Sequence, residues 1–158
     1  MLLSNILHER VIKMEVRSQG KAHATEELVD LLIEAGEIPL SLRAHALETI
    51  AERERQIGTG MDFGVAIPHG SSDRVPSLVG ALGISHSGVD FQSRDGGPAH
   101  IIVLLLIPRQ SFQEHIQAMA ATAKVMRQDE VRGAILDART PKELMRIIEE
   151  AEISGAAG

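Results

Sequence analysis

Apolar side chains recur every three or four residues in the first third of the chain, which is the spacing of one helix face. Residues 22–35 predict one such helix, which Gly36 follows at the usual stopping position, with Pro39 beyond it. A second helix is predicted from Ser41, as its N-cap, to about Gln56. The apolar positions are Ala24, Leu28, Leu31, Leu32 and Ala35 in the first helix, and Leu42, Ala46, Leu47, Ile50 and Ala51 in the second.

The C-terminal third carries two further helical patterns. Each begins with a capping box, in which Ser111 pairs with Glu114 and Thr140 pairs with Glu143. Pro141 stands at the favoured first position of the second of these helices. The predicted apolar stripes are Phe112, Ile116, Met119, Ala120, Ala123 and Met126, then Leu144, Ile147, Ile148 and Ala151.

Between the two helical regions the pattern changes to short apolar runs. Residues 78–84 and 100–107 predict strands, and the second is β-branched and apolar on both faces, as in a central, covered strand. A shorter apolar piece covers residues 65–67, and the glycines at 88, 96 and 97 mark turns. Strands mixed with helices predict an α/β layered domain.

Length and composition fit one compact domain. A chain of 158 residues with 44% apolar and 24% charged residues can bury an ordinary core without disulfides or metals. We place the domain at residues 1–153 and predict that residues 154–158, Ser-Gly-Ala-Ala-Gly, form a disordered tail.

The charge balance excludes several classes of function. Sixteen basic against twenty-two acidic residues give a net charge of −6, which argues against nucleic-acid binding and a polybasic membrane contact. With three Phe and neither Trp nor Tyr, an aromatic stacking platform is hard to build. The absence of Cys excludes disulfides, thiolate metal sites and a thiol nucleophile.

No segment of the sequence predicts membrane insertion. The longest apolar run, residues 101–107, is far shorter than the about 20 residues that a spanning helix needs. The N-terminal stretch lacks a basic leader, so we expect a soluble, cytoplasmic protein.

The most informative segment for chemistry is Ala66-Ile67-Pro68-His69-Gly70. Pro68 fixes its own φ and pushes Ile67 towards an extended conformation, while Gly70 permits an unusual backbone after the histidine. We therefore expect His69 to be rigidly held at an accessible surface turn. An imidazole with a pKa of about 6.5 is largely neutral at cellular pH and has a lone pair for nucleophilic attack. The alternative is a turn histidine without a function.

Upstream of His69 lie residue types that suit an anion. Arg53 offers planar donors that match phosphate oxygens, although residues 52–55 alternate in charge and could equally be a solvated helix surface. Thr59 stands among glycines that could offer backbone N–H groups and a hydroxyl to an anion, or simply form a flexible turn. No Gly-Lys-Ser/Thr follows, so this stretch is not a P-loop.

A second histidine of interest is His115. The predicted cap at Ser111 places it in the first turn of a helix, where the helix dipole is positive. It could line a cleft or be a half-buried helix residue. Metal motifs such as His-Glu-x-x-His are absent, and no Gly-x-Ser-x-Gly supports a serine triad.

Taken together, these motifs resemble the IIA domain of the bacterial phosphoenolpyruvate-dependent sugar phosphotransferase system, of the fructose/mannitol type (type 2), which includes the nitrogen-regulatory IIA proteins. The resemblance covers nearly the whole chain, to about residue 152. It is carried by Arg53-Glu54, Gly58-Thr59-Gly60, Gly64-Val65-Ala66-Ile67-Pro68-His69-Gly70 and Glu114-His115-Ile116.

The resemblance implies a fold and a site. The fold is a mixed β-sheet flanked by helices on both faces, in a single domain. His69 would accept a phosphoryl group from the phosphohistidine of HPr or its nitrogen-branch counterpart. Arg53, Thr59 and Gly70 would bind the phosphoryl oxygens, and His115 would form hydrogen bonds in the same pocket. No metal or cofactor is required, because phosphohistidine already has a good leaving group.

The resemblance also implies a function and partners. We expect a phosphotransferase component that carries phosphohistidine, of the nitrogen-regulatory type in view of its free-standing length and the opening Leu3-Ser4-Asn5-Ile6-Leu7. Its donor would be an HPr-type carrier, and its acceptor or target a IIB domain, a transporter or a kinase. The alternatives are a sugar-specific IIA component, a regulatory binding module that does not use phosphorylation, and a metal-dependent hydrolase using His69 and His115.

Several residues near the motif differ from the family pattern, among them Ser71-Ser72-Asp73 where a Lys is sometimes seen after His69-Gly70. Members often have Ile-Gly where this chain has Met61-Asp62, so that Asp62 puts a negative charge near the predicted phosphoryl site. Phe63 is large for this loop, and with Met61 it predicts an apolar docking patch.

Overall fold

A computed structural model of the chain describes residues 1–157. The helices are α1 (Leu3–Ile6), α2 (Lys21–Glu34), α3 (Arg43–Gln56), α4 (Phe112–Met126), α5 (Asp129–Asp137) and α6 (Pro141–Ala157), with 3-10 turns η1 (Glu9–Val11), η2 (Leu40–Leu42) and η3 (Asp62–Gly64). The strands are β1 (Ile12–Lys13), β2 (Val65–Ala66), β3 (His69–Ser72), β4 (Val79–Val89) and β5 (Ala99–Pro108).

A mixed, five-stranded sheet forms the centre of the molecule. Strand β5 runs antiparallel to β4 on one side and parallel to both β2 and β3 on the other, while β1 adds in parallel to β4. Strands β2 and β3 therefore lie end to end along β5, with only Ile67 and Pro68 between them. The predicted mixed sheet is confirmed.

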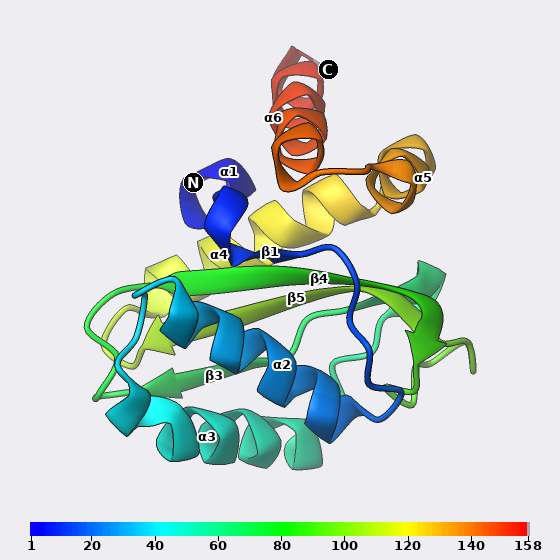
Figure 1. The fold of residues 1–158 in the computed structure, drawn as a ribbon. Helices are drawn as coiled ribbons and strands as arrows, with labels where there is room; N and C mark the ends of the chain where they lie inside the picture. Colours follow the sequence, from blue (N-terminus) through cyan, green and yellow to red (C-terminus); the bar gives the residue numbers. More distant parts are fainter. Residues whose placement is uncertain (158) are drawn as a thin grey trace.

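Helices cover the sheet on both faces, as predicted. Figure 1 shows α2 and α3 side by side below the sheet, and α1, α4, α5 and α6 above it. Gly36, in the left-handed conformation at φ 78°, ends α2 where the sequence predicts. The second predicted helix begins one residue late, with Leu42 rather than Ser41 as its N-cap, because a 3-10 turn occupies residues 40–42.

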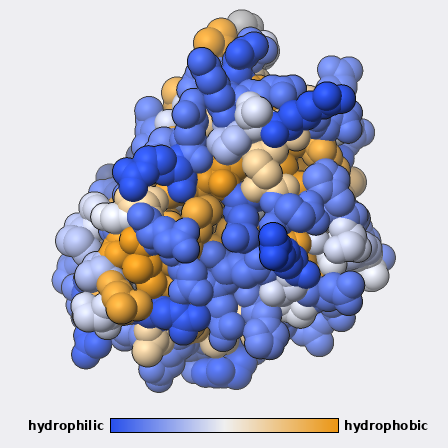
Figure 2. Space-filling view, viewed as in Figure 1, coloured by the Kyte–Doolittle hydropathy of each residue, from blue (hydrophilic) through white to orange (hydrophobic). Residues whose placement is uncertain are grey.

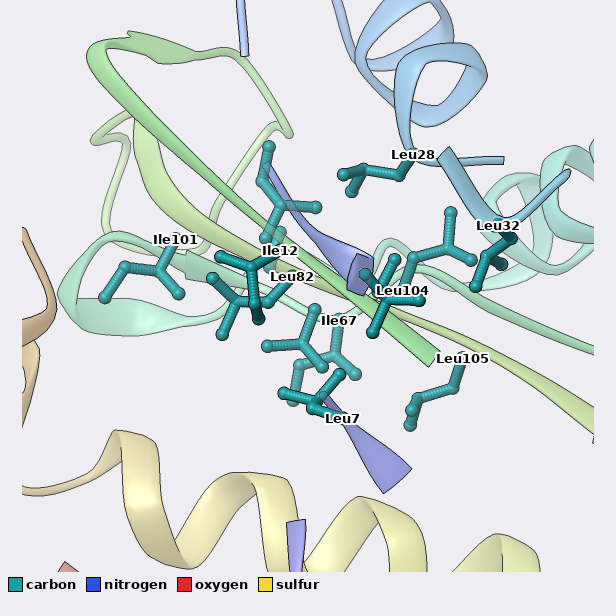
Figure 3. Packing of buried hydrophobic residues seen from close by; sticks show 14 of the residues in the cluster. Leu7, Ile12, Leu28, Leu32, Ile67, Leu82, Ile101, Leu104 and Leu105 are labelled. Carbon is teal, nitrogen blue, oxygen red and sulfur yellow. The ribbon is translucent and has the colours of Figure 1, made fainter. Parts of the chain in front are cut away.

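The core is built around β5. Residues 101–107 are at most 1% exposed, so this strand is covered on both faces, as its continuous apolar run predicts. Figure 3 shows Leu28 and Leu32 on one side of the β4–β5 layer and Leu7 on the other. Ile67 also lies in this cluster, so the chain just before His69 is anchored by a buried side chain.

The face of α4 that packs inward differs from the prediction. Its buried residues are Ala118, Ala121, Thr122, Val125 and Met126, whereas Phe112 and Ile116 of the predicted stripe are 71% and 53% exposed. The helix carries apolar residues on two adjacent faces, and periodicity alone does not say which one meets the sheet. Small residues pack inward over the middle of the helix, and Val125 and Met126 do so at its end, where Met126 is buried as predicted.

The two predicted capping boxes are formed only in part. Ser111 makes no side-chain cap at the start of α4. At the start of α6 the hydroxyl of Thr140 accepts the N–H of Glu143 at 3.1 Å, and the Glu143 carboxylate accepts from Arg139 rather than from Thr140. Both helices nevertheless begin where the sequence predicts.

The C-terminal stretch differs from the expected tail. Helix α6 continues through residues 154–157; Gly158 lies outside the described residues. Across residues 1–157 we find no helix with the length and apolarity to cross a bilayer. The face in Figure 2 is mainly hydrophilic, with apolar side chains in separate patches.

Candidate functional site

His69 opens strand β3 immediately after the interruption at Pro68. The ladder continues through this point, because the carbonyl of Pro68 accepts the N–H of Leu105 at 3.0 Å. His69 is only 3% exposed, so the prediction of a surface turn is wrong. The strand pairing that removes it from the surface is made with β5, which is distant in the sequence.

The hydrogen bonds of His69 determine which ring nitrogen is free. Its Nδ1 lies 2.8 Å from the carbonyl oxygen of Ile67, an acceptor only, so Nδ1 carries the proton and donates it. The lone pair is therefore on Nε2. Burial lowers the pKa of His69, and the nearby positive charge of Arg53 lowers it further, which keeps the ring neutral.

Close packing of α3 against β3 brings Arg53 to His69. A Cβ at Gly70 would lie 2.6 Å from Cγ2 of Thr49 and 3.2 Å from the backbone nitrogen of Ile50, so only glycine allows this approach. Gly70 itself does not have a positive φ, contrary to the expected unusual backbone. Arg53, one turn beyond Thr49, donates from Nη1 to the carbonyl of Ile57 at 2.7 Å.

The glycine-rich loop is fixed along the free edge of β2. Met61 donates its N–H to Val65 at 2.7 Å, and Ile67 donates to Thr59 at 3.0 Å. Gly60 is required here, because a Cβ would lie 2.6 Å from Oγ of Ser93. The loop is therefore an ordered wall beside His69 rather than a flexible turn.

Glu54 is part of the Arg53-Glu54 motif, but the sequence reasoning assigned it no role in the site. Its carboxylate accepts the backbone N–H of Thr59 at 3.1 and 3.2 Å and the Thr59 hydroxyl at 2.5 Å. Lys21 lies 3.6 Å from the same carboxylate. The Thr59 hydroxyl thus donates its proton to Glu54 and has no proton left to donate into the hollow. The signal in the sequence was the place of Glu54 beside Arg53 in the motif that carries the resemblance.

His115 meets His69 across the site. The two rings have centroids 5.3 Å apart and planes inclined at 75°, an edge-to-face contact. His115 lies in the first turn of α4 and is half-buried. Strand β5 leads directly into α4, so the strand that pairs with His69 also positions the second histidine.

These residues surround a hollow of about 270 Å³. Of the predicted site residues, Arg53, Thr59 and His69 line it, His115 joins it through its contact with His69, and Gly70 lies behind His69 against α3. The sequence reasoning did not predict Arg94, which also lines it. The remaining lining residues are Gly58, Gly60, Met61, Asp62, Ile67 and Met119.

Large apolar side chains are exposed on the elements that form the hollow, and we call Ile57, Met61, Phe63, Phe112 and Ile116 the apolar rim. Phe63 has φ 69°, which is rare for a bulky residue. The Arg132 guanidinium lies 4.8 Å from its ring centroid. A strained, exposed Phe beside a polar hollow is a feature of binding surfaces.

The arrangement suits an anionic electrophile. A neutral imidazole with Nε2 unprotonated is a nucleophile, and a guanidinium beside it can bind oxygen anions. Across the part of the chain that the structure describes, no three His, Asp or Glu side chains group as metal ligands do.

Comparison with known proteins identifies relatives over nearly the whole chain. The family model described as "Phosphoenolpyruvate-dependent sugar phosphotransferase system, EIIA 2" matches residues 5–151. The PTS system fructose-specific EIIA component of Haloferax volcanii is 30% identical over 148 residues, covering 94% of this chain and 95% of that protein.

Two solved structures share the fold. The nitrogen regulatory protein IIA-Ntr from Neisseria meningitidis has a TM-score of 0.83 and 27% identity, covering 92% of this chain and 98% of its own. The complex of enzyme IIAMTL with phosphorylated enzyme IIBMTL from Escherichia coli has a TM-score of 0.77 and 16% identity, covering 91% of this chain and 97% of the matched one.

Proposed function

Because the chain belongs to the EIIA 2 family of the phosphoenolpyruvate-dependent sugar phosphotransferase system, we propose that it carries a phosphoryl group on Nε2 of His69. The group comes from the phosphohistidine of an HPr-type carrier. The observation that carries this proposal is the bond from Nδ1 of His69 to the Ile67 carbonyl, which leaves the Nε2 lone pair free.

The transfer exchanges one nitrogen–phosphorus bond for another. The donor's N–P bond breaks, its electron pair stays on the donor nitrogen, and Nε2 of His69 supplies the pair for the new bond. His69 then carries a positive ring that keeps its proton on Nδ1. The Ile67 carbonyl, which already accepts that proton, stabilises the charged ring.

The surrounding groups supply positioning and charge. Arg53 binds the phosphoryl oxygens, and Thr59, held by Glu54, keeps the loop wall in place beside them. His115, edge-on to His69, hydrogen-bonds to the phosphoryl group and limits rotation of the His69 ring. Gly70 contributes by allowing α3 to approach rather than by binding phosphate.

The apolar rim provides the place where protein partners dock. A cytoplasmic HPr-type carrier delivers the group there, and a IIB domain receives it, as the complex of enzyme IIAMTL with phosphorylated enzyme IIBMTL suggests. A second candidate is regulation, because a structural relative is a nitrogen regulatory protein. In that case the phosphorylation state of His69 changes the affinity for a transporter or kinase.

The primary test is phosphoryl transfer from phosphoenolpyruvate through the general first enzyme and an HPr-type carrier. Intact-mass spectrometry should show one acid-labile phosphoryl group on the wild type and on His23→Ala, an exposed histidine away from the site. His69→Ala should show none. No label on the wild type from either a sugar-branch or a nitrogen-branch carrier would refute the proposal.

A second experiment separates the carrier from the regulator. The isolated phosphorylated protein is mixed with a IIB domain, and the label on each is followed in time. Onward transfer with turnover supports the sugar-specific role. A label that stays on His69 while the affinity for a transporter or kinase changes supports the nitrogen-regulatory role.

A further inference from the structure

Two side chains of opposite charge, Arg94 and Asp62, line the hollow beside His69, and neither has a hydrogen-bond or ion-pair partner within residues 1–157. Arg94, on the loop between β4 and β5, makes no hydrogen bond or ion pair within residues 1–157, although it lines the hollow. Asp62, on η3, lines the same hollow, and its Oδ1 is buried without a hydrogen-bond partner. The two lie beyond ion-pair distance of each other. Both are therefore available to something that enters the hollow.

A third polar group without a partner lies next to the wall of the hollow. Among the described residues, the buried side-chain atoms without a partner are Oδ1 of Asp62 and Oγ of Ser93. Ser93 precedes Arg94 and packs against Gly60, whose backbone forms the wall of the hollow. Native proteins rarely leave such atoms unpaired without a functional reason. Of these two atoms, Oδ1 of Asp62 belongs to a residue that lines the hollow, and Oγ of Ser93 lies behind the wall that Gly60 forms.

A phosphoryl group in the hollow changes the energy of these two charges in opposite directions. The group carries up to two negative charges. It attracts the Arg94 guanidinium, and no existing hydrogen bond or ion pair of Arg94 has to break for the two to meet. It repels the Asp62 carboxylate. Since Arg94 comes from a different element than Arg53, the two guanidinium groups can each bind separate phosphoryl oxygens.

We propose that Arg94 is a second phosphoryl-binding cation and that Asp62 is the opposing charge that limits how long the group is held. This inference rests on the proposed function of His69. Arg94 lengthens the lifetime of phosphohistidine by neutralising charge on the oxygens. Asp62 shortens that lifetime, so the balance of the two sets how readily the group moves on.

The experiment compares Arg94→Met, Asp62→Asn and the double variant. Arg146→Met, an exposed arginine on α6, is the matched control. The first readout is the affinity for inorganic phosphate, from the NMR shifts of the His69 and His115 rings. The second is the half-life of phosphohistidine after the donor is removed.

Arg94→Met should weaken phosphate binding by about 5-fold and shorten the half-life, the effect of one partly exposed charge pair. Asp62→Asn should tighten binding and lengthen the half-life by a similar factor. The double variant should fall between the two, and added salt should reduce all the differences. The control should match the wild type.

Two outcomes would overturn the inference. Unchanged phosphate affinity and half-life in Arg94→Met would show that Arg94 does not bind the group. If that variant instead only raised the KM for the carrier, Arg94 would belong to protein docking. The phosphate titration needs no carrier, so it still tests Arg94 if the wild type accepts no phosphoryl group. Failure of the wild type to accept a phosphoryl group would count against the proposed function of His69, not against phosphate binding by Arg94.

Discussion

At the scale of single residues, the site depends on where two protons are held. The Ile67 carbonyl keeps the His69 proton on Nδ1, and the Glu54 carboxylate keeps the Thr59 proton away from the hollow. The first interaction leaves a nucleophilic lone pair on Nε2. The second ties the glycine-rich loop to the end of α3. Both acceptors lie within five residues of the group they hold, so local geometry determines the reactive form of the site.

The first prediction concerns pH. Burial lowers the pKa of His69, so the folded protein binds this proton less readily than the unfolded chain does. As pH falls below about 6.5, the unfolded state takes up the proton first and the free energy of unfolding decreases. Urea denaturation across pH should show this decrease in the wild type, and His69→Gln should show less of it.

NMR titration of the histidine rings provides a direct check on the same residue. His69 should titrate below the ordinary histidine range, and phosphoryl acceptance should persist below pH 6.5 because its ring stays neutral. A His69 that titrates at or above the ordinary value would contradict the prediction.

The second prediction concerns Glu54. Glu54→Gln removes a charged acceptor from Thr59, an interaction worth about 1.5–3 kcal/mol. The loop wall should loosen, and the rate of phosphoryl transfer to His69 should fall by about 10-fold. Glu52→Gln is the matched control, because Glu52 is exposed on the same helix and, within residues 1–157, pairs only with Arg55. Equal rates in the two variants would exclude a positioning role for Glu54.

At the scale of elements, the contact between α3 and β3 matters most. Glycine at position 70 lets the helix approach until Thr49 and Ile50 would touch an added Cβ. This approach decides where Arg53, at the end of α3, lies relative to His69. Gly70 has no side chain to take part in the proposed chemistry, yet it sets the geometry of Arg53 and His69, which we propose do take part.

The third prediction tests that contact. Gly70→Ala places a Cβ 2.6 Å from Cγ2 of Thr49, so α3 must shift, at a cost of about 1–3 kcal/mol in unfolding free energy. Phosphoryl acceptance should fall with it as Arg53 is displaced. Adding Thr49→Ser removes that methyl group and should restore part of both losses.

A second glycine provides the control. At Gly133 in α5, an added Cβ has nothing within 4 Å, so Gly133→Ala should stabilise the protein by about 0.5–1 kcal/mol. Transfer activity should not change. A loss of stability there similar to that at position 70 would mean that the close approach of α3 is not the cause.

At the scale of the whole molecule, hydrogen bonds hold the first helix, α1, against the last helix, α6. The carboxylate of Glu152 on α6 accepts the backbone N–H of Leu3 at 2.6 Å and of Ser4 at 3.1 Å. We call these two hydrogen bonds the Glu152 clamp. Since Leu3 is fully buried as well, the clamp holds α1 on the helical layer that also contains α4. In Figure 1 the start of the chain lies against that layer.

The fourth prediction concerns this clamp. Glu152→Ala leaves two backbone N–H groups of α1 without their acceptor and should cost about 1–3 kcal/mol. Urea denaturation provides the measurement, and amide exchange at residues 3 and 4 should accelerate. Glu149→Ala, at an exposed position one turn earlier, should change neither. His69 should still accept phosphate, since the clamp lies outside the site.

The sequence by itself determined the fold class, the central strand and the identity of the family. Continuous apolar residues predicted that β5 is covered on both faces, and helical spacing located α2 and α6. These features are local in origin, because periodicity and turn residues act within a few positions. The Pro-His-Gly motif likewise singled out His69 from its neighbours alone.

Only the tertiary structure decided which groups surround His69. Its burial depends on pairing with β5, and the outward face of α4 depends on which apolar stripe packs more closely. Arg94 enters the hollow on a loop far along the chain, and Glu54 reveals its role only through its contact with Thr59. The pairing with β5 and the approach of Arg94 join residues that are far apart in the sequence and meet only in the folded chain, so no local pattern links them.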